Sequence, residues 1–143
     1  MVQQEFLDTY NIVVDNECII DLDSSTPIKF SRHLIFRVPG SAFTSNIHCG
    51  NFAKNVVQRV SEKKMTDFSY QQLFKWNDKG KLMFLADMSV YTRNRNFRLY
   101  KSSKYGKNVF LLPSSITRYQ YIDDHDLFMS SLVCNVEKPP FVR

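Results

Sequence analysis

The chain has 143 residues, of which 43% are hydrophobic and 14% aromatic, so it can form a folded core and is not an extensively disordered or low-complexity protein. Its net charge of +5 favours a polyanionic partner such as a nucleotide or a nucleic acid. Widely spaced cysteines without a CxxC pair exclude a zinc knuckle and a disulfide framework, and the absence of a long apolar run excludes a membrane span, which indicates a soluble intracellular protein.

The N-terminal third predicts a helix, a turn and then a strand. An apolar stripe of Phe6, Tyr10, Val13 and Val14 fits the tail of an amphipathic helix whose start is expected upstream of Met1. Residues 21–27, Asp-Leu-Asp-Ser-Ser-Thr-Pro, are expected to form a turn whose carboxylates serve a loop or a helix cap. Residues 28–38 alternate like a strand, and the core face is expected to be the apolar one, with Leu34, Phe36 and Val38.

The middle of the chain predicts a longer helix after the break at Pro-Gly-Ser. We expect it to be capped by Asn46 or Asn51 and to run to about Glu62, because apolar residues recur at every fourth position. Residues 63–80 predict a helical turn and a loop that ends in an Asn-Asp-Lys-Gly turn. Residues 81–92 read as a second extended run.

The last third predicts short strands at 97–101 and 109–112 on either side of a turn at 104–108. Asp123–Asp126 are expected to begin a last helix, where carboxylates suit the helix dipole. Lys138-Pro139-Pro140 is expected to end the structure. Strands mixed with about three helices indicate an α+β fold.

One candidate phosphate-binding set is Lys29, Ser31 and His33. Alternate residues of a strand project on one side, and a cation, a hydroxyl and an imidazole there could all donate hydrogen bonds to phosphate oxygens. The alternative is a half-buried strand with an ordinary solvated face, since alternation is common in strands.

A second candidate is Asp87, a lone carboxylate beside the apolar run Leu-Met-Phe-Leu-Ala. An ionised carboxylate buried in a strand costs several kcal/mol unless a cation pairs with it. A divalent metal would meet this need, as in two-metal nucleotidyl transfer. A salt bridge to a nearby arginine, or an outward-facing position on an edge strand, would meet it equally well.

A third candidate is the basic and aromatic stretch from Val90 to Lys104. It carries five cations interleaved with aromatic side chains: Arg93, Arg95, Arg98, Lys101 and Lys104, with Tyr91, Phe97, Tyr100 and, just beyond, Tyr105. Arginine forks bind phosphate and aromatic rings stack on bases, so nucleotide or nucleic-acid binding is favoured. The alternative is a solvated basic loop whose aromatic rings point into the core.

These segments resemble the eukaryotic primase-polymerases of the archaeo-eukaryotic primase superfamily. The matching segments are residues 22–36, which contain Ser-Arg-His, and residues 46–52, 87–104 and 130–135. The resemblance covers about 21–57 and 83–135, and the run Val-Tyr-Thr-Arg-Asn-Arg-Asn-Phe-Arg-Leu-Tyr-Lys-Ser-Ser-Lys is its most specific part. It implies part of an RRM-like catalytic sheet with flanking helices.

The resemblance also implies an activity and roles for individual residues. The activity is that of a DNA primase and DNA polymerase, a template-directed nucleotidyltransferase that uses Mn²⁺ or Mg²⁺. The implied enzyme acts as a monomer on nucleoside triphosphates, with a single-stranded DNA template and primer. The family serves replication-fork restart, translesion synthesis and damage tolerance in the nucleus and mitochondrion. The implied roles are metal binding and catalysis by Asp87, nucleotide binding by Lys29, Ser31, His33, Arg98 and Lys104, and DNA binding by Arg95 and Asn96.

The chain departs from the family pattern in ways that bear on activity. The family's first metal motif is an Asp-x-Glu pair on a strand upstream of the matched region, and Asp21-x-Asp23 lies downstream of that position. The family's template-binding helix and zinc-binding segment are also not matched, and residues 61–81 are shorter than the family's variable insert. We therefore expect residues 1–143 to form one partial catalytic domain that does not synthesise DNA unaided.

Two other functional classes remain open from the sequence. The chain could be a catalytically inactive fragment or paralogue that only binds nucleotide or DNA. It could also be a basic interaction domain that binds no nucleotide.

Overall fold

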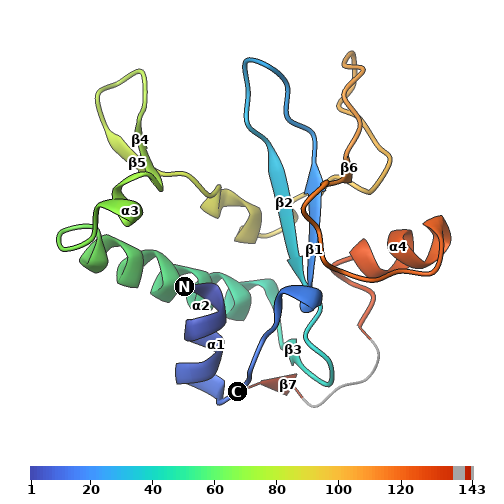
Figure 1. Ribbon diagram of the computed structural model, residues 1–143, viewed down its shortest axis with the longest axis horizontal. Helices are drawn as coiled ribbons and strands as arrows, with labels where there is room; N and C mark the ends of the chain where they lie inside the picture. The colour runs from blue at the N-terminus through green and yellow to red at the C-terminus, as the bar shows by residue number, and fades with distance from the viewer. Residues whose placement is uncertain (137–140, 143) are drawn as a thin grey trace. The chain divides into compact units, whose positions relative to one another are not determined.

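The computed structural model describes residues 1–136 and 141–142 (Figure 1). The predicted end at Lys138-Pro139-Pro140 lies outside the described residues. The chain folds as two compact units, one formed by Met1–Val13 with Phe43–Asn96 and the other by Val14–Ala42 with Phe97–Val142. Both contain helices together with antiparallel strand pairs, which confirms the α+β class. In the described part of the chain, no helix is both long and apolar enough to cross a bilayer.

The first unit is built around three helices: α1 (Val2–Tyr10), α2 (Asn46–Lys63) and α3 (Phe68–Gln71). The predicted long helix is confirmed as α2, but its cap was assigned to the wrong residue. The hydroxyl of Ser45 accepts the backbone N–H of His48 at 3.2 Å and satisfies a donor of the first turn. Asn46 uses its side chain elsewhere and donates to the carbonyls of Tyr91 and Thr92.

The core of the first unit lies between α1 and α2. Phe52, Val56 and Val60 are buried on α2, as their spacing predicts. The ring of Phe6 on α1 lies 4.5 Å from the ring of Phe52, centroid to centroid. The predicted amphipathic helix is confirmed at Phe6 and Tyr10, but its bounds were wrong. Helix α1 begins at Val2 and ends at Tyr10, where Asn11 adopts a positive φ of 55°, so Val13 and Val14 lie beyond it.

A hairpin follows α3. Strand β4 (Phe74–Trp76) pairs antiparallel with β5 (Leu82–Phe84) across the predicted Asn-Asp-Lys-Gly turn. Residues 81–92 do not form one strand, which corrects the sequence prediction. The strand ends at Phe84, and a short 3₁₀ helix, η2 (Met88–Tyr91), follows because the Asp87 side chain caps it.

The second unit carries an antiparallel sheet of order β2-β1-β6. A 3₁₀ turn, η1 (Asn16–Cys18), leads into β1, and the other bounds are β1 (Ile19–Asp23), β2 (Arg32–Phe36) and β6 (Leu112–Pro113). The expected turn at 21–27 is therefore wrong in its first half. Asp21 and Asp23 lie within β1, and the chain reverses between Thr26 and Lys29.

The core face of β2 is the opposite of the predicted one. Leu34 is 54% exposed, whereas Ile35 is buried with Ile20 and Leu22 of β1. The register explains this, since Ile35 stands opposite Ile20 and His33 stands opposite Leu22. The buried cluster is completed by Tyr100, Leu111 and Leu127. His33 therefore shares its face with the core residues of the sheet.

The remaining elements of the second unit are short. Helix α4 (Asp124–Ser131) begins where predicted, and the side chain of Asp123 caps it by accepting the N–H of Asp126 at 2.8 Å. Residues 97–101 form no strand, because Lys101 adopts a positive φ of 59° and turns the backbone. Strand β3 (Ala42–Phe43) lies where the chain passes between units, and β7 is Phe141–Val142.

Candidate functional site

The residues predicted to bind ligands fall on both units of the chain. The second unit carries Lys29, Ser31, His33, Arg98 and Lys104, and the first carries Asp87, Arg95 and Asn96. We describe the two groups separately.

In the second unit, a chain of polar contacts joins the loop after β1 to the residue that precedes β2. The guanidinium of Arg98 donates to the Ser24 hydroxyl, and this hydroxyl donates to that of Ser31 at 3.0 Å. The backbone N–H of Ser24 also donates to the Ser31 carbonyl at 2.9 Å. Ser24 is only 8% exposed. Arg98 is thus held in one orientation by a residue that sequence reasoning missed.

His33 lies in the same group. Its ring centroid is 4.6 Å from that of Phe97, one of the aromatic residues of the predicted basic and aromatic stretch. Burial lowers the pKa of His33, and the charges of Arg98 and Lys104 lower it further. The imidazole is therefore neutral at pH 7 when no anion is bound.

Two nitrogen atoms of this group are buried without a hydrogen-bond partner among the described residues. They are Nδ1 of His33 and Nε of Arg98. Buried polar atoms are nearly always paired in folded proteins, and an unpaired one needs an explanation such as a ligand. An anionic oxygen could accept a hydrogen bond from either nitrogen, and the neighbouring cation would favour it.

The two lysines of the predicted set, Lys29 and Lys104, have exposed side chains, unlike His33 and Arg98. Lys104 is exposed, and its charge acts on His33. Lys29 lies in the turn between β1 and β2, where its backbone bonds to that of Thr26 at 2.8 and 3.1 Å and its side chain is exposed. The predicted strand face of three residues is thus wrong at Lys29, because the strand begins only at Arg32.

An arginine clamp lies on the other face of the sheet. The guanidinium of Arg32 pairs with Asp21 and Asp23 on β1 and also donates to the hydroxyl of Ser114, next to β6. The Asp21 side chain is 13% exposed and the Arg32 side chain 18%, so the pair is largely shielded from water. The carboxylates expected in a loop instead tie the strands of the sheet together. The register places Arg32 directly opposite Asp23, but a single strand's sequence cannot reveal that pairing.

In the first unit, Asp87 is an exposed helix cap. Its Oδ1 accepts the N–H of Ser89 at 2.9 Å. The pKa of Asp87 is lowered mainly by a hydrogen bond from the Ser89 side chain, then by this backbone bond, with a smaller contribution from the charge of Arg95. The expectation of a carboxylate within a strand is therefore wrong. Arg95 donates through Nε to the Ser89 carbonyl at 3.1 Å, and Asn96 is exposed.

The described carboxylates do not fit a complete metal centre. No group of three His, Cys, Asp or Glu residues among the described residues is placed to hold an ion. Sequence reasoning also passed over Asp15-Asn16-Glu17, the one Asp-x-Glu of the chain. It lies at η1 rather than on a strand, with Asp15 as the residue before that turn. Divalent metals prefer several oxygen ligands, so Asp87 by itself supplies too few.

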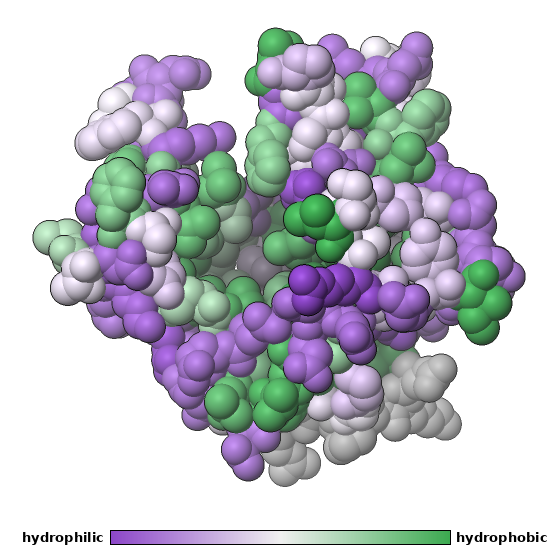
Figure 2. Space-filling view, viewed as in Figure 1, coloured by the Kyte–Doolittle hydropathy of each residue, from purple (hydrophilic) through white to green (hydrophobic). Residues whose placement is uncertain are grey.

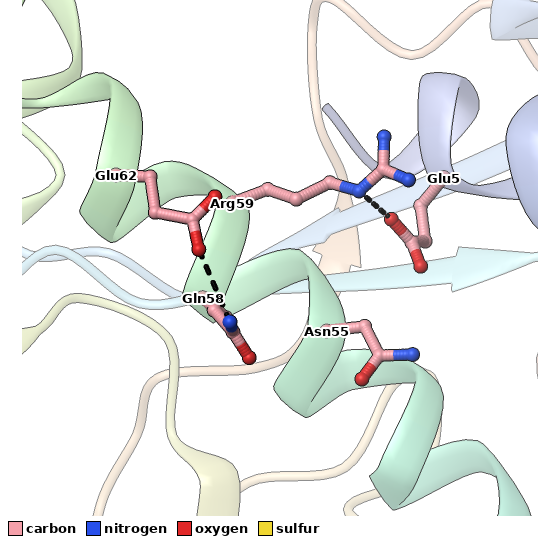
Figure 3. Close-up of a pocket in the computed structure, with 5 residues that line it drawn as sticks. All are labelled: Glu5, Asn55, Gln58, Arg59 and Glu62. Carbon is pink, nitrogen blue, oxygen red and sulfur yellow. Dashed lines mark hydrogen bonds and ion pairs between the residues drawn. The ribbon is translucent and has the colours of Figure 1, made fainter.

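A separate polar pocket of about 270 Å³ lies on the first unit (Figure 3). It is lined by Glu5, Asn55, Gln58, Arg59 and Glu62. Its buried carboxylate is already paired, since Nε of Arg59 lies 2.5 Å from Glu5 and the Thr9 hydroxyl donates to Glu5 at 3.0 Å. We therefore interpret this pocket as the surroundings of a structural ion pair between helices α1 and α2, and not as a ligand site.

The chain is similar over most of its length to proteins that are named DNA-directed primase/polymerase. DNA-directed primase/polymerase proteins of Danio rerio, Mus musculus and Bos taurus are 32%, 33% and 34% identical to it over 94%, 89% and 93% of its residues. The match to the Danio rerio protein extends over 165 aligned residues, more than the 143 of this chain, so that relative carries insertions. No protein-family model matches the sequence.

The same alignments cover 32%, 32% and 35% of the three relatives. The chain therefore spans about a third of the length of the curated relatives it matches. Because the similarity extends over nearly all of the chain, the resemblance seen in its motifs is confirmed, and the chain is homologous to about a third of the length of the DNA-directed primase/polymerase proteins.

Proposed function

We propose that the chain binds the triphosphate of a nucleoside triphosphate through Ser31, His33 and Arg98, with Lys29 and Lys104 adding positive charge. In the whole protein this site would serve template-directed nucleotidyl transfer on single-stranded DNA, with Arg95 and Asn96 near the template. The family's work in fork restart and damage tolerance, in the nucleus and mitochondrion, belongs to the same proposal.

The observation that carries the proposal is the pair of buried nitrogens on His33 and Arg98 without partners among the described residues. Nucleotide phosphates offer oxygens that accept from such donors. The Ser24 and Ser31 hydroxyls hold Arg98 in place before a ligand arrives, which lowers the entropy cost of binding.

A second function is favoured for the chain by itself, namely binding without synthesis. One exposed carboxylate at Asp87 does not make a metal centre in the described part of the chain. We propose that catalysis with Mn²⁺ or Mg²⁺ requires further carboxylates, and that this chain binds nucleotide or DNA without extending a primer. Primer extension by the purified 143-residue chain would contradict this proposal.

The test is a calorimetric titration of the chain with a deoxynucleoside triphosphate, which measures the affinity. Losing a charge-assisted hydrogen bond costs about 1.5–3 kcal/mol, so Arg98→Ala should weaken binding about 10- to 150-fold. Ser31→Ala should have a smaller effect in the same direction. Arg118→Ala, at an exposed arginine of the same unit, is the matched control and should leave the affinity unchanged. Equal affinity of all four proteins would support a basic interaction domain instead.

A further inference from the structure

Large apolar side chains are exposed around the β4–β5 hairpin of the first unit. Trp76 is 70% exposed, Phe68 72% and Met65 79%. Trp76 and Met65 line a groove of about 300 Å³, whose other lining residues are Lys64, Gln71, Phe74 and Leu82. Figure 2 shows green, apolar atoms gathered at the base of this hairpin, with purple, hydrophilic atoms around them. A cluster of this kind marks an interaction site more often than a scattered surface residue does.

The hairpin holds Trp76 in a defined position. Trp76 pairs with Leu82 across the two strands. The side-chain oxygen of Asn77 accepts the N–H groups of Lys79 and Lys81 at 3.0 and 2.9 Å, which fixes the turn beside it. The exposed indole is therefore presented by an ordered strand, with little conformational entropy left to lose on binding.

Positive charge surrounds the groove and selects the class of partner. The ammonium of Lys64 lies 4.3 Å from the centroid of the Phe74 ring, and that of Lys63 lies 5.8 Å from the Tyr70 ring. Lys79 and Lys81 add charge at the turn. Aromatic faces bordered by lysines fit single-stranded nucleic acid, in which bases stack on the rings and phosphates meet the cations.

The hairpin also leads directly into the predicted functional stretch. Asp87 lies five positions along the chain from Leu82, the partner of Trp76. At about 3.4 Å per residue, the chain places Leu82 no more than about 17 Å from Asp87. A strand of DNA that passes Arg95 and Asn96 in the same unit could thus extend over the hairpin by a few nucleotides.

We propose that the groove of the β4–β5 hairpin binds single-stranded DNA, with a base stacked on Trp76 and a phosphate at Lys64. The identification of DNA as the strand rests on the proposed function. Binding by the groove is measured separately from nucleotide binding.

The experiment uses Trp76 as its own reporter, because it is the one tryptophan of the sequence. Titration of the chain with unlabelled oligothymidylate should quench the tryptophan fluorescence saturably, and salt should reverse the quenching. In fluorescence anisotropy with a labelled oligothymidylate, Trp76→Ala should weaken binding about 5- to 150-fold, since a stacked base contributes about 1–3 kcal/mol.

Two lysines provide a matched pair. Lys64→Ala should weaken binding and lower the slope of log affinity against log salt by about 0.7, as expected for one lost phosphate contact to a single strand. Lys75 lies between Phe74 and Trp76 on β4, so its side chain points to the other face of the hairpin. Lys75→Ala should therefore change affinity less than Lys64→Ala does. Equal losses of affinity in Lys64→Ala and Lys75→Ala would show that only nonspecific charge attracts the DNA, and this would overturn the proposal.

Further outcomes separate the proposals. Saturable quenching by polyglutamate but not by oligothymidylate would identify an acidic polypeptide as the partner and overturn the DNA assignment. The absence of quenching by either polyanion would overturn the docking surface itself. Arg98→Ala should weaken triphosphate binding about 10- to 150-fold while leaving the oligothymidylate quenching intact. Trp76→Ala should weaken oligothymidylate binding, measured by anisotropy, while leaving triphosphate binding intact. Failure of one site therefore does not imply failure of the other.

Discussion

Two arginines three residues apart, Arg95 and Arg98, differ in almost every physical respect. Arg95 is exposed and bonds to a backbone carbonyl of its own segment. Arg98 is half-buried, bonds to the Ser24 hydroxyl in the loop after β1 and keeps a buried Nε without a partner among the described residues. The boundary between the two units falls between them. A run of cations that looks uniform in sequence thus contains one residue suited to general attraction and one suited to recognition.

The carboxylates show the same contrast. Asp21 is largely shielded and Asp23 is 33% exposed, and the two share one guanidinium, whereas Asp87 is exposed and caps a short turn. Shielded charges contribute to stability through their partners, and exposed ones contribute little. Substitutions in the two groups should therefore differ in size, and this difference can be measured.

The largest effect is expected for Arg32→Ala. It leaves two carboxylates of β1 without their cation in a largely shielded site, which should cost about 2–3 kcal/mol of unfolding free energy. Hydrogen exchange of the β1 and β2 amides reports the second unit and should show the loss. Arg118→Ala, at an exposed position, should change the same amides by less than about 0.5 kcal/mol. Equal protection in the two variants would show that the clamp contributes nothing to stability.

The next largest effect on stability is expected where η2 packs against α2 in the first unit. A methyl group at Gly50 would lie 2.8 Å from Cβ of Tyr91, closer than carbon atoms approach in folded proteins. Overpacking costs about 1–3 kcal/mol, and the better helix propensity of alanine offsets about 1 kcal/mol, so Gly50→Ala should destabilise the unit by up to about 2 kcal/mol. Urea unfolding followed by Trp76 fluorescence measures this. Asn55→Ala, at an exposed site of α2, should instead be neutral or slightly stabilising.

Local patterns predicted the elements whose signal lies within one segment. The four-residue period of Phe52, Val56 and Val60 identified α2, and the acidic cluster at Asp123 identified the start of α4. The predictions that were wrong concern features determined by residues elsewhere in the chain. The core face of β2 depends on the register with β1, which places Ile35 opposite Ile20.

The candidate site divides in the same way. The family motif identified Ser31, His33 and Arg98, and the structure brings Ser31 and Arg98 together through Ser24. No pattern within a strand pointed to Ser24, because its role comes from hydrogen bonds to Ser31 across the turn and to Arg98 far along the chain. For Asp87, the apolar run before it indicated a buried strand, but the Asp-x-Ser capping bond ended the strand first.

A smaller effect is expected at Asp87. Loss of the cap in Asp87→Ala should cost about 1 kcal/mol, whereas Asp87→Asn should be within about 0.5 kcal/mol of the original chain, since asparagine is an equally good cap. Because the site has only one carboxylate among the described residues, Mn²⁺ should shift the unfolding temperatures of the original chain and of Asp87→Asn equally. A Mn²⁺-dependent shift that Asp87→Asn abolishes would show instead that Asp87 binds the metal in this chain.

The smallest expected effect is a pH dependence that arises from His33 in the second unit. Because burial and two cations lower its pKa, the folded unit binds fewer protons than the unfolded chain. The stabilising contribution of the neutral imidazole is therefore present above the unfolded pKa of about 6.5 and decreases as pH falls through the folded value. His33→Asn should flatten the pH dependence of amide protection in β1 and β2 over this range, ahead of the carboxylate titrations at lower pH.

A bound triphosphate should reverse the sign of the His33 shift, because phosphate charge favours the imidazolium. Binding should then take up protons near pH 6 and tighten as pH falls. Calorimetry in buffers of different ionisation enthalpy measures this uptake directly. His48→Asn is the control, since His48 lies in the first unit and bonds to Tyr10 and Thr44. Proton uptake that persists in His33→Asn but disappears in His48→Asn would move the anion site from the second unit to the first.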